Sequence, residues 1–263
     1  MNAKMTTWET VRDKARILNA LAIRDVMSRY GHGNIGFFWL VAEPLILTGG
    51  VMFVWGLING SSKHGVHIVP FVLTGYSMLT LWRHLVYSSI SCFGRSADVL
   101  YHRAVTPFDI LLSKQFTEIF GVLTAFFVAY VPLRLLDLTE PIDDYLTFFG
   151  AWFLMSFFTF GVGLIIASLT EMTEAAERFI GPIMYLLLPA SGSFYMVGWM
   201  PRGIQDSLTY IPMLNAMEMF RGGYFGPSIP TYWDAGYIFI CGLVVNAAGF
   251  AMISKAIRRL EFR

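Results

Sequence analysis

Long apolar stretches separated by short polar segments make up most of this chain. A helix needs about 20 consecutive apolar residues to cross the hydrocarbon core of a bilayer, because each residue adds only ~1.5 Å of length. Six stretches reach that length, and Pro182 and Pro189 are expected to kink the fifth. The six are residues 35–58, 68–93, 108–136, 146–169, 179–199 and 235–254. The pattern predicts an all-α integral membrane protein with six transmembrane helices.

Residues 1–34, before the first span, carry a helical pattern of a different kind. Apolar residues recur there at spacings of three and four, which places them on one stripe of a helix over 6–30: Trp8, Val11, Ala15, Leu18 and Ala22. We expect an amphipathic interface helix that lies among the inner headgroups. Two interpretations stay open: the helix only anchors the chain, or it also packs against a cytoplasmic partner.

Residues 200–233 are too long for a simple turn between two spans. They contain the run Ile211–Phe220, which is too apolar for a free loop and too short to cross a bilayer. Glycines and prolines on both sides of the run provide breaks. The segment therefore predicts re-entrant helices before the last span, with a folded outer cap as the alternative.

The composition supports a membrane protein. Residues of the AVILMFWYC set make up 56% of the 263 residues, and charged residues only 14%, against about 25% in soluble proteins. A net charge of +1 exerts no general attraction on nucleic acid. These values exclude a soluble enzyme, a disordered chain and a basic nucleic-acid-binding protein, and two cysteines are too few for a disulfide framework.

The positive charges predict the orientation. With the N-terminus inside, 14 of the 19 Lys and Arg residues lie in the inner segments, including the basic tail 255–263. Inner loops of membrane proteins are enriched in Lys and Arg. We therefore expect both termini to be cytoplasmic.

One cation lies within a predicted span. Placing Arg83 in hydrocarbon costs at least about 2.5 kcal/mol unless it faces water or a partner. Tyr76, Arg83 and Tyr87 share a helix face, and such a face suits a sugar chain or a lipid phosphate. The alternative is a structural pair between Arg83 and Glu43. The candidate substrate pathway comprises Trp39, Glu43, Tyr76, Trp82, Arg83, His84 and Tyr87.

Catalytic motifs are missing. Gly31 and Gly36 have the spacing of a phosphate-binding loop, but Phe37 and Phe38 stand where Lys and Ser or Thr are required. His64 and His67 lie three residues apart in the loop 59–67, and no third metal ligand accompanies them. We expect no metal site, no cofactor and no ATP hydrolysis by this chain.

Three groups of residues are distinctive as a set. They are Arg29-Tyr30 with Gly36–Trp39 and Glu43–Leu45, then Tyr101–Pro107, and finally Ile211–Asn215 with Phe220-Arg221. Together the chain resembles the permeases of ABC type-2 exporters, and within them those of bacterial capsular polysaccharide exporters.

This resemblance implies a homodimer in the bacterial inner membrane above a separate ATPase dimer, which would bind ATP and Mg²⁺. Its cargo would be a lipid-linked anionic polysaccharide, with periplasmic and outer-membrane proteins continuing the route. Coupling to the ATPase would involve Asp98, Tyr101, His102, Arg103, Glu171 and Glu174. Lipid headgroups, including the acidic lipid end of the cargo, would meet Arg24, Arg29 and Tyr30.

Other functions stay open at this point. An exporter of drugs or small lipids could share the fold. A membrane enzyme acting on lipid-linked sugars would need paired carboxylates or a His cluster, and Glu171, Glu174 and Glu177 are the nearest set. A channel or secondary carrier would need buried acids, of which Glu43 is nearly alone.

Overall fold

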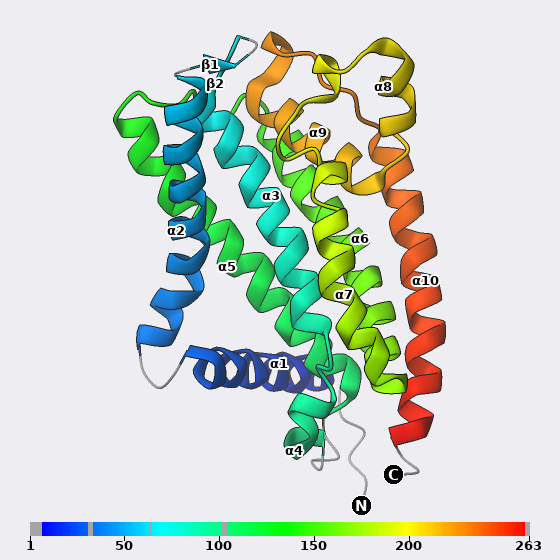
Figure 1. Ribbon diagram of the computed structural model, residues 1–263. Helices are drawn as coiled ribbons and strands as arrows, with labels where there is room; N and C mark the ends of the chain where they lie inside the picture. The colour runs from blue at the N-terminus through cyan, green and yellow to red at the C-terminus, as the bar shows by residue number, and fades with distance from the viewer. Residues whose placement is uncertain (1–6, 31–33, 61, 64, 101–104, 261–263) are drawn as a thin grey trace, which may run out of the picture.

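The computed structural model describes residues 7–30, 34–60, 62–63, 65–100 and 105–260. Helices dominate this part of the chain (Figure 1). They are α1 (Thr7–Tyr30), α2 (Asn34–Asn59), α3 (Ile68–Ser89), α4 (Ala97–Leu100), α5 (Pro107–Leu135), α6 (Tyr145–Met172), α7 (Glu174–Leu186), α8 (Arg202–Leu208), α9 (Pro212–Phe225) and α10 (Ala235–Leu260). A small antiparallel hairpin of β1 (Ser62–Lys63) and β2 (Val66–His67) joins α2 to α3.

Four of the described helices are long and apolar enough to cross a membrane, which confirms the all-helical membrane class. They are α2, α5, α6 and α10, and they lie over four of the expected spans. The helix α3 has 22 residues but includes Arg83 and His84, and it is not among the four. The six-span organisation stays a prediction.

The expected span 179–199 is wrong as a single helix. Instead α7 ends at Leu186, and the chain continues through a 3₁₀ turn at Pro189–Ser191. Proline at 189 lacks the N–H for the next helical bond, and its ring would meet the carbonyl four residues back. Gly192 then takes a positive φ of 74° and turns the chain away. At 13 residues, α7 extends only about 20 Å, less than the thickness of a bilayer core.

The N-terminal helix is present where the pattern predicted it. In Figure 1, α1 lies across the lower end of the bundle, at a steep angle to α2 and α5. Its packed side carries Leu21, Asp25 and Val26, which are buried, whereas Ala15 is exposed. The face toward the bundle is therefore partly ionic and is offset from the apolar stripe.

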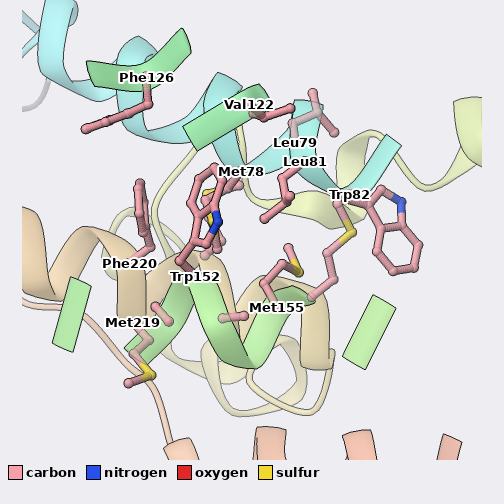
Figure 2. Close-up of a cluster of buried hydrophobic side chains, with 14 of the residues drawn as sticks. Met78, Leu79, Leu81, Trp82, Val122, Phe126, Trp152, Met155, Met219 and Phe220 are labelled. Atoms are coloured by element: carbon pink, nitrogen blue, oxygen red, sulfur yellow. The ribbon is translucent and has the colours of Figure 1, made fainter. Parts of the chain in front are cut away.

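Residues 200–233 divide into the short, exposed α8 and the buried α9 at the upper end of the bundle (Figure 1). Almost every residue of α9 is buried, so the apolar run is not a free loop. Figure 2 shows Phe220 of α9 beside Trp152 of α6, with ring centroids 5.8 Å apart. Phe148 is closer still to Phe220, at 4.2 Å. The re-entrant path through the membrane stays a prediction.

The close contact between α6 and α10 depends on small residues. A Cβ placed on Gly161 would lie 2.7 Å from the backbone nitrogen of Asn246. The Asn246 side chain donates across this seam to the carbonyl of Phe157, at 2.8 Å. Small residues with interhelical hydrogen bonds are the usual means of helix association in lipid, where apolar burial gives little driving force.

Candidate functional site

Two adjoining hollows open between α2 and α3 in the described part of the chain. The one nearer α1, here called the lower cavity, has a volume of about 310 Å³. The one nearer α9, the upper groove, has about 460 Å³. Leu47 and Arg83 line both, so the two hollows meet at these residues. A continuous polar-to-aromatic surface therefore follows the α2–α3 seam.

Arg83 is half-buried where the two hollows meet. Its guanidinium lies over the ring of Tyr87, 5.8 Å from the centroid, and Tyr76 lines the upper groove above it. The helix face that carries Tyr76, Arg83 and Tyr87 thus lines the two hollows. Within the described residues Arg83 forms no ion pair, although Glu43 lines the same lower cavity.

Polar side-chain contacts between helices hold the walls of the lower cavity in place. His84 Nδ1 lies 2.9 Å from Glu118 Oε2, which joins α3 to α5. Lys114 Nζ lies 3.2 Å from Asp25 Oδ1, which joins α5 to α1, and both side chains are nearly buried. Arg95 adds another cation at the lower edge. The polar lining of the cavity can therefore accommodate a charged or strongly hydrated group, which lipid tails cannot do.

The upper groove has an aromatic wall. The rings of Trp55 on α2 and Phe194 after α7 stack with centroids 5.9 Å apart and planes at 21°. Both line the groove, and sequence reasoning missed both. Trp55 could have been found, because it follows Leu47 by eight residues, which is about two turns along α2. Nothing local predicts Phe194, since it follows the break in α7.

Two predicted pathway residues lie elsewhere. Trp82 is buried and stacks on Phe158 of α6 at 6.0 Å, so it lines neither hollow. It is one residue from Arg83, which turns it about 100° around the helix toward α6. Trp39 on α2 is 46% exposed and lies outside both hollows.

One candidate headgroup residue contacts one candidate coupling residue. Arg24 of α1 forms an ion pair with Asp98 of α4, so one member of each predicted set contacts the other. The side chains of Arg29 and Tyr30 lie outside the described residues, as do all of Tyr101, His102 and Arg103.

The connection between α6 and α7 holds the turn that follows α3. Glu171 Oε1 accepts a hydrogen bond from the backbone N–H of Gly94 at 2.8 Å, and Glu177 Oε2 accepts one from Ser91 Oγ at 2.9 Å. Ser91 has a φ of 46°, unusual for a residue other than glycine, and its N–H donates to Thr170 Oγ1 at 3.0 Å. Glu174 is exposed. This set of contacts, the α3–α4 clamp, binds the turn between α3 and α4 to the α6–α7 connection.

A metal-dependent enzyme would need a cluster of ligands, and the part of the chain that the structure describes contains no group of three or more His, Cys, Asp or Glu arranged for a metal. Among the described residues, the His84 ring and the Glu118 carboxylate lie within hydrogen-bond distance of each other.

Comparison with known proteins places these features in context. A family model described as "ABC-2 type transporter" matches residues 17–225. The capsule polysaccharide export inner-membrane protein CtrC of Neisseria meningitidis serogroup B is 35% identical over 258 residues, which cover 98% of this chain and 97% of that protein. BexB of Haemophilus influenzae, with the same description, is 32% identical with the same coverage. The polysialic acid transport protein KpsM of Escherichia coli is 19% identical over 89% of this chain and 91% of its own length.

Proposed function

This chain belongs to the ABC-2 type transporter family, and we propose that it is the membrane-spanning permease subunit of an ATP-driven exporter of capsular polysaccharide. Relatives that match almost its whole length are named for capsule polysaccharide export at the inner membrane. We propose the same location and cargo class for this chain, with the polymer carried on a lipid and bearing negative charge.

The observation that carries this proposal is Arg83. It is half-buried between two hollows, without an ion pair among the described residues, in a helix packed within an apolar bundle. Lipid tails cannot accept a hydrogen bond from a guanidinium, whereas a carboxylate or phosphate accepts two in a bidentate ion pair. Above it, the faces of Tyr76, Trp55 and Phe194 can pack against the C–H faces of sugar rings.

The complete exporter needs a second copy of this chain and an energy source. Only 17% of the residues in the apolar stretch Val41–Ile58 of α2 are buried within one copy, which leaves the α2 side of both hollows available to a partner in a homodimer. A separate ATPase dimer would bind ATP and Mg²⁺ and press on α4. Periplasmic and outer-membrane proteins would receive the polymer.

The proposed topology has six spans, of which the fifth combines α7 with the irregular segment that follows it. It also has re-entrant α8–α9 and cytoplasmic termini. In its support, α1 and the end of α10 lie at the same end of the bundle, opposite α8 and α9 (Figure 1). At that end α1 would lie among the headgroups, with Arg24 and Asp98 joining it to α4.

Force would reach the pathway through the α3–α4 clamp. Because Glu171 and Glu177 bind the turn after α3, a push on α4 would displace α3, α6 and α7 together. The face of α3 that carries Arg83 would move with them and change the width of the two hollows.

The test compares Arg83→Ala with Arg134→Ala in cells that lack the native gene. Arg134 lies at the exposed end of α5 and pairs with Asp137, so it is a matched surface control. We expect Arg83→Ala to abolish surface polysaccharide while membrane insertion and co-purification with the ATPase persist, and Arg134→Ala to export normally. Normal capsule on Arg83→Ala cells contradicts the role of Arg83, and vanadate-insensitive transport contradicts an ATP-driven exporter.

A further inference from the structure

The segment after α7 places an aromatic ring on the upper groove, although this ring, that of Phe194, lies outside any helix or strand. The helix ends at Leu186, and Phe194 lies in an irregular stretch that follows a 3₁₀ turn. Its ring nevertheless stacks on Trp55 of α2 and lines the groove. Some contact outside this segment must hold its backbone.

That contact comes from Arg221 of α9, whose side chain is completely buried. Its Nη1 donates to the carbonyls of Gly192 and Tyr195, each at 2.7 Å, and its Nη2 donates to the carbonyl of Ser193 at 3.0 Å. These carbonyls lie on both sides of Phe194. One planar guanidinium therefore fixes the backbone before and after the ring.

The surroundings are shaped around this guanidinium. It lies over the ring of Phe71 on α3, 4.4 Å from the centroid, and Phe71 lies 5.9 Å from Trp55. A Cβ on Gly75 would come within 2.6 Å of both Arg221 Nη2 and the carbonyl oxygen of Ser193. Glycine at 75 thus leaves the space that the arginine and the loop occupy.

A neighbouring acid fixes the same segment further along. Glu218, three residues before Arg221 and equally buried, accepts hydrogen bonds from the backbone N–H groups of Val197 and Tyr232, each at 3.2 Å. Burying such ionic groups is costly, and apolar residues of similar volume often give equal or greater stability. Placing the loop is a function that apolar replacements could not perform.

We propose that Arg221 is a positioning residue for the upper groove, which it serves by holding residues 192–195 so that Phe194 faces Trp55. This inference rests on the proposed function, because the groove is part of the export route. Arg221 itself touches no cargo. Lysine keeps the charge but donates from a single point, so it cannot reproduce the fork to three carbonyls.

The test is a double-mutant cycle of Arg221→Lys and Phe194→Ala in the assembled exporter. Each single change should lower the export rate by up to about tenfold, the scale of one lost aromatic contact. Because Arg221 acts through Phe194, Arg221→Lys should add no further loss in the Phe194→Ala protein. Multiplied defects, or normal export by Arg221→Lys, would overturn the inference.

A second measurement does not depend on transport. In a protein with Trp55→Cys and Phe194→Cys, a short thiol cross-linker should join the two side chains when Arg221 is kept, and much less when Arg221→Lys is added. Gly75→Ala, which presses on the same contact from α3, should reduce cross-linking too, whereas Gly203→Ala, with no atom within 4 Å of the new Cβ, should not.

Equal cross-linking in all variants overturns the inference. If the wild-type complex exports no polysaccharide while the protein with Trp55→Cys and Phe194→Cys cross-links as expected, the proposed function is refuted and the positioning role of Arg221 is supported. Melting temperatures measured in parallel show whether Arg221→Lys has lost its fold. If it has, the cross-linking of Gly75→Ala is compared with that of Gly203→Ala instead.

Discussion

Replacing Gly161 with alanine tests how closely α6 and α10 must approach. The added Cβ would lie 2.7 Å from the Asn246 nitrogen and 2.9 Å from the Val245 carbonyl carbon, whereas ordinary contacts begin near 3.4 Å. Both obstacles are backbone atoms, so no side-chain rotation relieves them, and the helices must separate locally by about 0.7 Å. Overpacking of this kind costs about 1–3 kcal/mol. Separation also stretches the hydrogen bond from Asn246 to Phe157.

The assay is thermal unfolding of the purified chain in detergent, with Gly181→Ala as the matched control. Gly181 is also inside a helix, but its added Cβ meets nothing within 4 Å, so alanine there should be neutral or stabilising by up to about 1 kcal/mol. At about 2–4 °C per kcal/mol, a cost of about 1–3 kcal/mol should lower the melting temperature of Gly161→Ala by roughly 2–12 °C. A melting point within about 1 °C of the wild type, or equal shifts for both glycines, refutes the close-packing argument.

The other predictions concern polar contacts. Glu171→Ala removes the hydrogen bond to the N–H of Gly94 and should lower export while the partner's ATPase rate in the complex is retained; parallel loss of both activities contradicts the clamp. Lys114→Met removes an ion-pair partner of the nearly buried Asp25 carboxylate and should destabilise the protein by up to about 3 kcal/mol, measured as melting temperature and monodisperse yield. Lys114→Met with Asp25→Asn should recover most of that loss, and an equally damaged double variant counts against the buried pair. Asn246→Ala loses donation to two carbonyls and should cost about 0.6–1.7 kcal/mol; an unchanged melting temperature is the contrary result.

Properties that depend on neighbours in the chain could be read from the sequence alone. Hydropathy identified the membrane class, and periodicity located α1, because a helix of 3.6 residues per turn orders its own side chains. The same regularity placed Tyr76, Arg83 and Tyr87 on one face of α3, and the structure places that face on the two hollows.

Contacts between distant segments were decided only by the tertiary structure. The carbonyls that Arg221 binds lie 26 to 29 residues earlier in the chain, and Phe194 meets Trp55 across a separation of more than 100 residues. The break of α7 before Pro189 turned an expected span into an irregular segment with a ring on the groove. Such pairings depend on how helices pack in three dimensions, and local hydropathy and spacing contain no information about which distant backbone will lie opposite a given side chain.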